Sequence, residues 1–249
     1  MRPLEGVRIA VTRPADAAPA LAEALRAAGA EPVVVPLTRI APPLDIAPLQ
    51  EAAAHLDRYS WVVFTSANAV EALASAIGSG EPVRSRIAVV GSGTADAVRR
   101  RLGRSPDLVP DDFSAQGLVT ALRREGTLRS ARILWPRGDR ARDVIPQALL
   151  DAEALLDDPI AYRTIDEADA ARRLAALVEQ GAVDVITFTA PSAVACYVGA
   201  AGAVEHVVIA VIGAATGAEA ERLGMPVHVL PMEHSAAGLV RAIAAHFSS

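Results

Sequence analysis

Short apolar runs alternate with helical patterns along the chain. The runs are continuous and rich in β-branched residues, which is typical of strands buried on both faces of a sheet. We expect strands at Val7–Thr12, Val33–Leu37, Trp61–Thr65, Ile87–Val90, Ile133–Trp135, Val183–Thr187 and Val207–Ile212. We expect helices at Pro19–Ala28, Ala67–Ile77, Thr94–Leu102 and Thr216–Leu223. Several of them end at a glycine, as helices commonly do. This alternation predicts an α/β fold with parallel sheets.

The sequence contains an internal repeat with a period of roughly 120–125 residues. The repeated pairs are Phe64–Val70 with Phe188–Val194, Ile87–Ala95 with Ile209–Gly217, Pro110–Val119 with Pro231–Val240 and, more weakly, Arg8–Arg13 with Arg132–Arg137. The period is far too long for a solenoid, so the chain consists of two copies of a domain-sized unit. We therefore predict two doubly wound α/β domains, each built on a parallel sheet.

The repeated motifs lie where a strand ends and a helix begins, which is where open parallel sheets bind ligands. They place hydroxyls and free backbone N–H groups at helix starts, a favourable setting for an anion. The residues concerned are Thr65 and Ser66, Ser192, Gly91 to Thr94, and Gly213 to Thr216. The simpler alternative is that Ser66, Ser192, Thr94 and Thr216 only cap their helices. Four such ends from two domains could instead converge on one anionic ligand.

Charge and composition narrow the function classes. The chain has 249 residues, 52% of them hydrophobic, and a formal charge of −5, which argues against a general nucleic-acid binder. Arg137, Arg140 and Arg142 form a local cluster that could bind a small polyanion or, equally, mark a solvated helix start. The single cysteine fits a reducing compartment. With no apolar run of ~18 residues and no signal-peptide pattern, we expect a soluble, cytoplasmic protein without membrane partners.

Cofactor and metal motifs are missing from the sequence. Gly91-x-Gly93 is followed by Asp96, where a dinucleotide fingerprint has glycine or alanine, and no Walker A or Gly-x-Ser-x-Gly motif occurs. The five histidines have no metal-ligand spacing with each other or with Cys196, which we interpret as a core residue. We therefore expect no cofactor and no metal ion.

At this point the motifs resemble those of a known family. They are Val11–Pro14, Phe64–Val70, Pro136–Asp139 with Arg142, Tyr162–Thr164, Thr187–Val194 and Ile212–Thr216. Each is short, but their order and spacing across nearly the whole chain resemble uroporphyrinogen-III synthase. Two departures from the family pattern stand out. Ala190 replaces a usual serine, and Ala214-Ala215 replaces a proline and a hydroxyl residue.

The resemblance implies a lyase of haem, sirohaem and cobalamin biosynthesis. It would cyclise hydroxymethylbilane through a spiro intermediate, with inversion of ring D and loss of water. The resemblance implies two flavodoxin-like, doubly wound parallel-sheet domains joined by a two-segment linker. These domains are residues 1–38 with 163–249, and residues 41–160, with the substrate cleft between them. Prolines in the two crossing segments, Leu37–Pro43 and Pro159–Ile165, fit extended linkers.

The resemblance also implies the site residues. Tyr162 would be the catalytic partner of the leaving hydroxyl, the alternative being a packing residue between domains. The substrate-binding residues would be Thr12, Arg13, Thr65, Ser66, Thr94, Arg137, Gly138, Ser192, Gly213 and Thr216. We expect a monomer, with hydroxymethylbilane synthase as a candidate partner. The competing hypothesis is a non-catalytic two-lobed binding or regulatory protein for a small polyanion.

Overall fold

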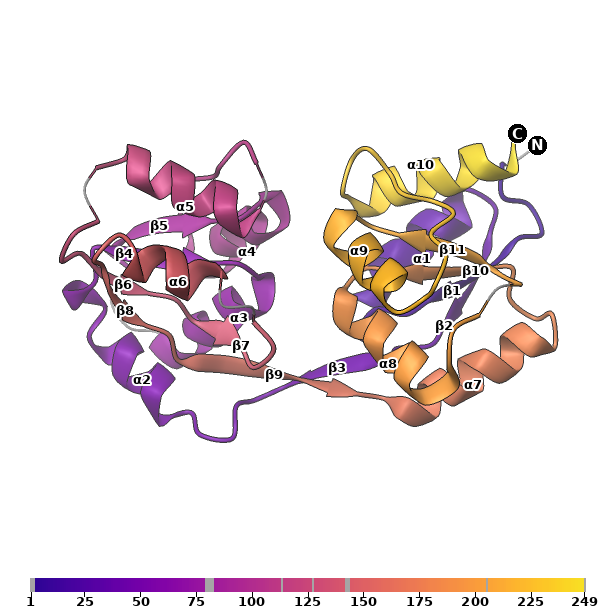
Figure 1. The fold of residues 1–249 in the computed structure, drawn as a ribbon, viewed down its shortest axis with the longest axis horizontal. Helices are drawn as coiled ribbons and strands as arrows, with labels where there is room; N and C mark the ends of the chain where they lie inside the picture. Colours follow the sequence, from indigo (N-terminus) through magenta and orange to yellow (C-terminus); the bar gives the residue numbers. More distant parts are fainter. Residues whose placement is uncertain are drawn as a thin grey trace. The chain divides into compact units, whose positions relative to one another are not determined.

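The computed structural model of the chain describes residues 3–78, 83–112, 114–126, 128–141, 144–204 and 206–248, traced in Figure 1. The chain divides into two compact units. Unit 1 comprises residues 1–39 and 165–249, and unit 2 comprises residues 40–164. Of the domain bounds expected above, the one that differs most from these units is the end of the middle domain, residue 160 against residue 164.

Unit 1 is built on a parallel sheet with the strand order β11-β10-β1-β2. Its strands are β1 Arg8–Val11, β2 Glu31–Val34, β10 Val185–Phe188 and β11 Val208–Val211. An isolated parallel bridge between Ala210 and Val229 extends the sheet beyond β11. Its helices are α1 Ala18–Ala27, α7 Ala168–Glu179, α8 Pro191–Ala201, α9 Ala214–Arg222 and α10 Ala236–Phe247.

Unit 2 has a second parallel sheet, with the strand order β5-β4-β6-β8. Its strands are β4 Trp61–Phe64, β5 Arg86–Val89, β6 Arg132–Leu134 and β8 Leu155–Asp157, and the Ala88–Leu108 bridge extends the sheet beyond β5. Its helices are α2 Ala47–Ala54, η1 Leu56–Arg58, α3 Ala67–Ile77, α4 Ser92–Leu102, α5 Ala115–Arg124 and α6 Val144–Leu150. The chain passes between the units in β3, Thr38–Ala41, and β9, Ile160–Asp166; with β7, Arg137–Gly138, they form a small sheet ordered β3-β9-β7.

The internal repeat explains why the two large sheets have the same order. The first copy runs from β1 to α5 and the second from β6 to α10, so that β1 matches β6, β4 matches β10, and β5 matches β11. Numbered within a copy, the strands of each sheet follow the flavodoxin-like order 2-1-3-4-5, counting the bridge as the fifth. In each sheet, however, strands 1 and 2 come from one copy and strands 3 to 5 from the other. Figure 1 shows this exchange, with indigo β1 beside orange β10.

Helices cover both faces of each sheet. In unit 1, α1 and α10 pack together on one face, and α7, α8 and α9 form the layer on the other. Ile9 and Val11 point toward the first layer and Ala10 toward the second, because successive strand residues face opposite sides. This two-sided burial is the reason that the strands are continuous apolar runs. The α/β fold class with two doubly wound sheets is confirmed.

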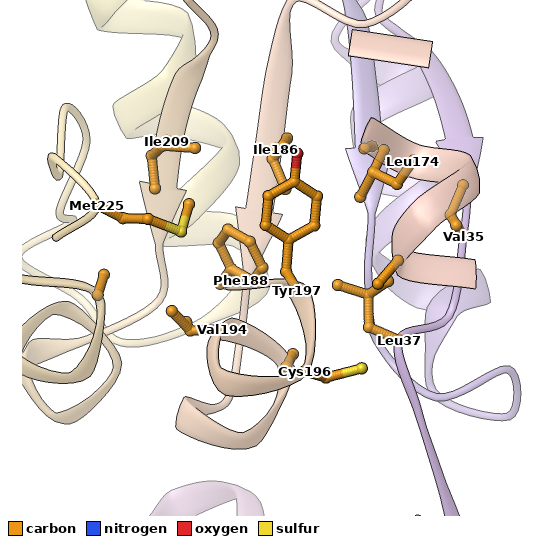
Figure 2. Packing of buried hydrophobic residues seen from close by; sticks show 14 of the residues in the cluster. Val35, Leu37, Leu174, Ile186, Phe188, Val194, Cys196, Tyr197, Ile209 and Met225 are labelled. Carbon is orange, nitrogen blue, oxygen red and sulfur yellow. The ribbon is translucent and has the colours of Figure 1, made fainter. Parts of the chain in front are cut away.

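Figure 2 shows the core under α7 to α9. Tyr197 extends from α8 over the sheet, and its ring meets the ring of Phe188 edge-on, with centroids 6.0 Å apart and planes at 69°. Cys196 is buried in the same cluster, as its apolar surroundings in the sequence predicted. Unit 2 repeats the arrangement, with α2, α3 and α4 on one face and α5 and α6 on the other.

Three predicted elements have wrong boundaries. The strand predicted at Val33–Leu37 spans Glu31–Val34. Val35 and Leu37 still donate backbone hydrogen bonds to Val11 and Thr12, but Pro36 between them has no N–H and interrupts the ladder. The helices predicted to begin at Thr94 and Thr216 begin at Ser92 and Ala214.

The repeated Pro-x-x-x-Ser-Ala-x-Gly motif proves to be a helix cap. The hydroxyls of Ser114 and Ser235 accept hydrogen bonds from the N–H groups of Gly117 and Gly238, at 2.9 and 3.0 Å. Both glycines leave room for the preceding loop. A Cβ at Gly238 would lie 2.1 Å from the carbonyl oxygen of Glu233, and one at Gly117 would lie 2.2 Å from that of Asp112.

Gly238→Ala should therefore destabilise the protein strongly. The methyl group must displace backbone rather than a flexible side chain, and overpacking of this kind costs about 1–3 kcal/mol or more. We expect a melting temperature lower by several degrees, measured by circular dichroism, at roughly 2–4 °C per kcal/mol for a chain of this size. Gly199→Ala is the matched control, because it lies in α8 with nothing within 4 Å of its Cβ position. Equal melting temperatures for the two variants would contradict this account.

Candidate active site

Most of the expected site residues lie at the carboxyl edges of the two large sheets, meaning the residues that follow the strands and begin the next helices. Arg137 and Gly138 lie in β7 and Tyr162 lies in β9, both in the small sheet. Unit 1 holds Thr12, Arg13, Ser192, Gly213 and Thr216, and unit 2 holds Thr65, Ser66, Thr94, Arg137, Gly138 and Tyr162. In each sheet, strand 1 lies next to strand 3, and their following helices cover opposite faces. This is the topological switch point at which sheets of this order bind ligands.

Thr12 ties the switch point of unit 1 together. Its hydroxyl is fully buried and donates to the carbonyl oxygen of Thr187 at 2.6 Å, and the Thr187 hydroxyl donates to Ala10 O at 2.7 Å. Thr12 lies one residue beyond Val11, the last paired position of β1, so its bond extends the connection between β1 and β10 past the end of their ladder. Because the Thr12 hydroxyl donates its hydrogen bond within the protein, we interpret Thr12 as a residue that holds the strand ends in place.

Arg13 follows directly and is a half-buried cation. Within the part of the chain that the structure describes, its guanidinium forms no hydrogen bond and no ion pair. Burial lowers the pKa of the Arg13 guanidinium, and the attraction of Asp16 offsets this only in part. The group remains charged at neutral pH, so the carboxyl edge of unit 1 presents a partly desolvated positive charge whose hydrogen-bond donors are available to an anion.

Gly213 and Thr216 form the turn from β11 into α9. Gly213 is the extended residue before the helix, with φ −173°, and Thr216 lies buried in the first turn. A Cβ at Gly213 would lie 3.2 Å from Cγ of His234 and 3.3 Å from its Nδ1, so the imidazole of this exposed residue rests against the turn. Ser192 is the second residue of α8, two positions after the extended Ala190.

In unit 2, Thr65 and Ser66 connect β4 to α3. The Ser66 hydroxyl accepts a hydrogen bond from the Ala69 N–H at 3.2 Å and caps the helix. The Thr65 hydroxyl accepts one from the indole Nε1 of Trp135 at 3.3 Å, which joins the ends of β4 and β6. The switch point of unit 2 is therefore also held by a side-chain bond between strands 1 and 3, although through different residue types.

Tyr162 reaches this edge from β9. Its backbone pairs with Gly138 of β7, and its carbonyl oxygen accepts a hydrogen bond from the Asp139 N–H at 3.1 Å. The ring is half-buried against the α3 face of the core, and its hydroxyl interacts with the side chains of Ser66 and Asn68. Burial raises the pKa of the Tyr162 phenol, and this effect is larger than the lowering by the hydrogen bond with Ser66. The phenol is therefore neutral at neutral pH and can donate a hydrogen bond.

Arg137 precedes Gly138 on β7, and its guanidinium already has protein partners. Its Nε donates to Asp158 Oδ2 at 2.8 Å, and its guanidinium carbon lies 6.0 Å from the ring centre of Trp135. The guanidinium of Arg137 is therefore less available to a ligand than the spacing of the arginines in the sequence indicated. Arg140 also has partners within the protein, and Arg142 lies outside the described residues.

The capping alternative holds for one of the four hydroxyl residues. Ser66 is an N-cap, whereas the residues before α4, α8 and α9 are Gly91, Ala190 and Gly213. Thr94 and Thr216 instead lie in the first helical turn with buried side chains. The N-cap residues of α4 and α9 are glycines, which have no side chain that marks a cap in the sequence. The sequence pattern therefore favours a following hydroxyl residue, a threonine in each case, as the cap.

Sequence reasoning missed several residues at these edges. Asn68 and Asp139 both lie inside recognised motifs, so their polar side chains next to Ser66 and Gly138 were a usable signal. The Asp139 carboxylate accepts a hydrogen bond from the Thr164 N–H at 3.0 Å and thereby fixes the backbone after Tyr162. His234 had no such signal, since it occupies an unmatched position of the repeated cap motif.

Comparison with known proteins finds relatives that match most of this chain. The family model described as uroporphyrinogen-III synthase HemD matches residues 19–241. The chain is 32% identical to uroporphyrinogen-III synthase from Synechococcus elongatus over 97% of this chain and 96% of that protein. The chain belongs to the uroporphyrinogen-III synthase family. It is thus a member of a family of enzymes of tetrapyrrole synthesis. A putative uroporphyrinogen-III synthase from Methanothermobacter thermautotrophicus is 28% identical over 95% of this chain and 97% of its own length.

Solved structures show the same fold at low sequence identity. A mutant uroporphyrinogen III synthase from Thermus thermophilus superposes with a TM-score of 0.70 at 16% identity, covering 98% of this chain and 99% of that one. The synthase from Helicobacter pylori gives 0.61 at 15% identity, covering 96% and 99%. Among the described residues, no helix combines the length and the apolar character needed to cross a bilayer.

Proposed function

We propose that this chain cyclises hydroxymethylbilane to uroporphyrinogen III, inverting the last pyrrole ring and releasing water. The observation that carries the proposal is the neutral phenol of Tyr162, half-buried at the carboxyl edge of unit 2 in a chain that matches the family over almost its full length. A phenol in this state can donate a hydrogen bond to a departing hydroxyl without carrying a charge of its own.

The proposed reaction begins at the terminal hydroxymethyl group. Its C–O bond breaks as Tyr162 donates a hydrogen bond or its proton to the leaving oxygen, and an electrophilic azafulvene remains. The substituted carbon of the last ring attacks it to form the spiro intermediate, which then rearranges and closes the macrocycle. A ring carbon loses one proton at the end, so water is the only other product and the phenol is restored. Assistance to a poor leaving group is the task for which one positioned donor contributes most.

Binding is the second task, because the substrate carries acetate and propionate groups on its rings. All 24 basic residues of the chain are arginines, whose planar forks suit carboxylates. Arg13 has donors available, whereas Arg137 would have to share its guanidinium between Asp158 and the substrate. We therefore assign Arg13 to substrate carboxylate binding, and Arg137 to a second carboxylate contact that it can make only while it shares its guanidinium with Asp158.

A product assay tests the proposal. The purified protein is incubated with hydroxymethylbilane, the products are oxidised to porphyrins, and isomers I and III are separated by chromatography. We expect isomer III to predominate, at the same rate with and without EDTA, since the sequence holds no cofactor or metal motif. Isomer I alone, at the rate without protein, would refute catalysis; tight product binding in that case would favour the non-catalytic binding protein. A monomeric state, a cytoplasmic location and a partnership with hydroxymethylbilane synthase stay predictions.

A further inference from the structure

Gly138 lies directly beneath the hydroxyl end of Tyr162. A Cβ built on Gly138 would lie 2.8 Å from Cζ, 2.9 Å from the hydroxyl oxygen and 3.0 Å from Cε2 of that ring. These distances are shorter than real contacts of a methyl group with an aromatic ring. The phenol therefore occupies the space that any other residue at position 138 would fill with its own side chain.

The glycine is required for space rather than for its backbone freedom. Gly138 is not among the glycines with positive φ, and it forms part of β7, in register with Tyr162 of β9. Other residues can adopt this extended backbone, so an alanine would leave the strand pairing intact. What it would change is the position of the phenol above it.

The rest of the surroundings hold the ring from its other sides. Ala161, the residue before Tyr162, is buried in the α3 face of the core, and the ring packs against the same cluster. The hydrogen bonds from Asp139 N–H to Tyr162 O, at 3.1 Å, and from Thr164 N–H to Asp139, at 3.0 Å, fix the backbone on both sides. With the ring confined in this way, a methyl group at 138 must displace the hydroxyl end from its position next to Ser66 and Asn68.

We propose that Gly138 is a positioning residue, whose missing side chain sets the location of the Tyr162 hydroxyl for the reaction. The inference rests on the proposed function of Tyr162 and revises the role expected for Gly138, which was direct substrate binding. Its physical basis is that donor geometry must be held to a fraction of an ångström, and a misplacement of 1 Å can cost about 100-fold in rate.

Gly138→Ala tests the inference. We expect kcat to fall about 10-fold or more while KM stays within about threefold, because the donor is displaced and the groups that bind the carboxylates are not. The melting temperature should change little. Gly199→Ala, the same substitution at an open helical position, should leave kcat and KM at wild-type values. Wild-type kcat in Gly138→Ala would overturn the inference.

A double-mutant cycle shows whether Gly138 acts through the hydroxyl. In a Tyr162→Phe background there is no hydroxyl to misplace, so adding Gly138→Ala should lower kcat no more than about twofold. A loss of the same size in both backgrounds would overturn the positioning role. The cycle also separates this inference from the proposed function. An inactive wild-type protein would refute the function itself, and a fully active Tyr162→Phe variant would refute the donor on which the inference rests, whatever Gly138→Ala does.

Discussion

Tyr162→Phe should lower the turnover of hydroxymethylbilane about 10- to 1,000-fold, the range for loss of one positioned donor. The substitution removes only the oxygen that we assign to the departing hydroxyl. The ratio of isomers among enzyme-made products should stay largely the same, because the folded path of the substrate is set by many other contacts. The measurement is single-turnover kinetics combined with isomer analysis.

Tyr59→Phe is the matched control in the same unit. The Tyr59 hydroxyl donates to Asp157 at 2.7 Å, and Tyr59 itself comes two residues before β4. This variant should lose stability because it loses this partly buried hydrogen bond, but it should keep wild-type turnover. Full activity in Tyr162→Phe would contradict the assignment. It would mean that water or the carboxyl groups of the substrate supply the proton instead.

The pH dependence of turnover gives a second check on Tyr162. Since burial raises the pKa of the phenol above its usual value of about 10, the donor stays protonated throughout the physiological range. Any loss of turnover that results from its ionisation must therefore occur in alkaline solution, above that value. A loss between pH 6 and 9 that disappears in Tyr162→Phe would contradict the raised pKa.

Arg13→Gln should raise KM about 10- to 100-fold, as expected for a charge-assisted hydrogen bond of ~1.5–3 kcal/mol, with a smaller effect on kcat. Stability should not fall. Removal of a half-buried cation without an ion pair relieves a desolvation cost, so the melting temperature should stay the same or rise. Steady-state kinetics and thermal unfolding measure the two effects on one preparation.

Arg26→Gln serves as the control for Arg13. It is the same substitution at an exposed position in the last turn of α1. KM should not change in this variant. If Arg13→Gln also left KM unchanged, or if it lowered the melting temperature, Arg13 would be a structural or surface residue rather than a carboxylate ligand.

Local patterns explain why much of the fold could be predicted. Apolar runs such as Trp61–Phe64 and Val185–Phe188 are strands because both faces of each are buried, and each pattern is complete within a few residues. The boundary errors have equally local causes. At Pro36 a missing N–H ends the regular ladder of β2, and at Gly91 and Gly213 an extended glycine takes the cap position that the following threonine was expected to fill.

The candidate site could be predicted only as a set of motifs. The sequence placed Arg13, Ser66 and Tyr162 among functional residues, but it could not distinguish a free side chain from an engaged one. Arg13 has no ion-pair partner among the described residues, whereas Arg137 pairs with Asp158, twenty-one positions later in the chain. Only the register of β7 against β9 brings Gly138 against the Tyr162 ring, and no local pattern reports a contact between strands so far apart.

The sequence by itself determined the strands, the helices and their duplication, because these depend on periodicity and turn residues within short segments. The repeat did not determine which copy supplies which half of each sheet; the family resemblance implied that arrangement, and the tertiary structure decides it. β1 would make similar contacts beside β4 of its own copy as it makes beside β10, so the repeat cannot distinguish the two arrangements. The choice lies in the connecting segments, where extended β3 and β9 carry the chain away from its own copy instead of folding it back.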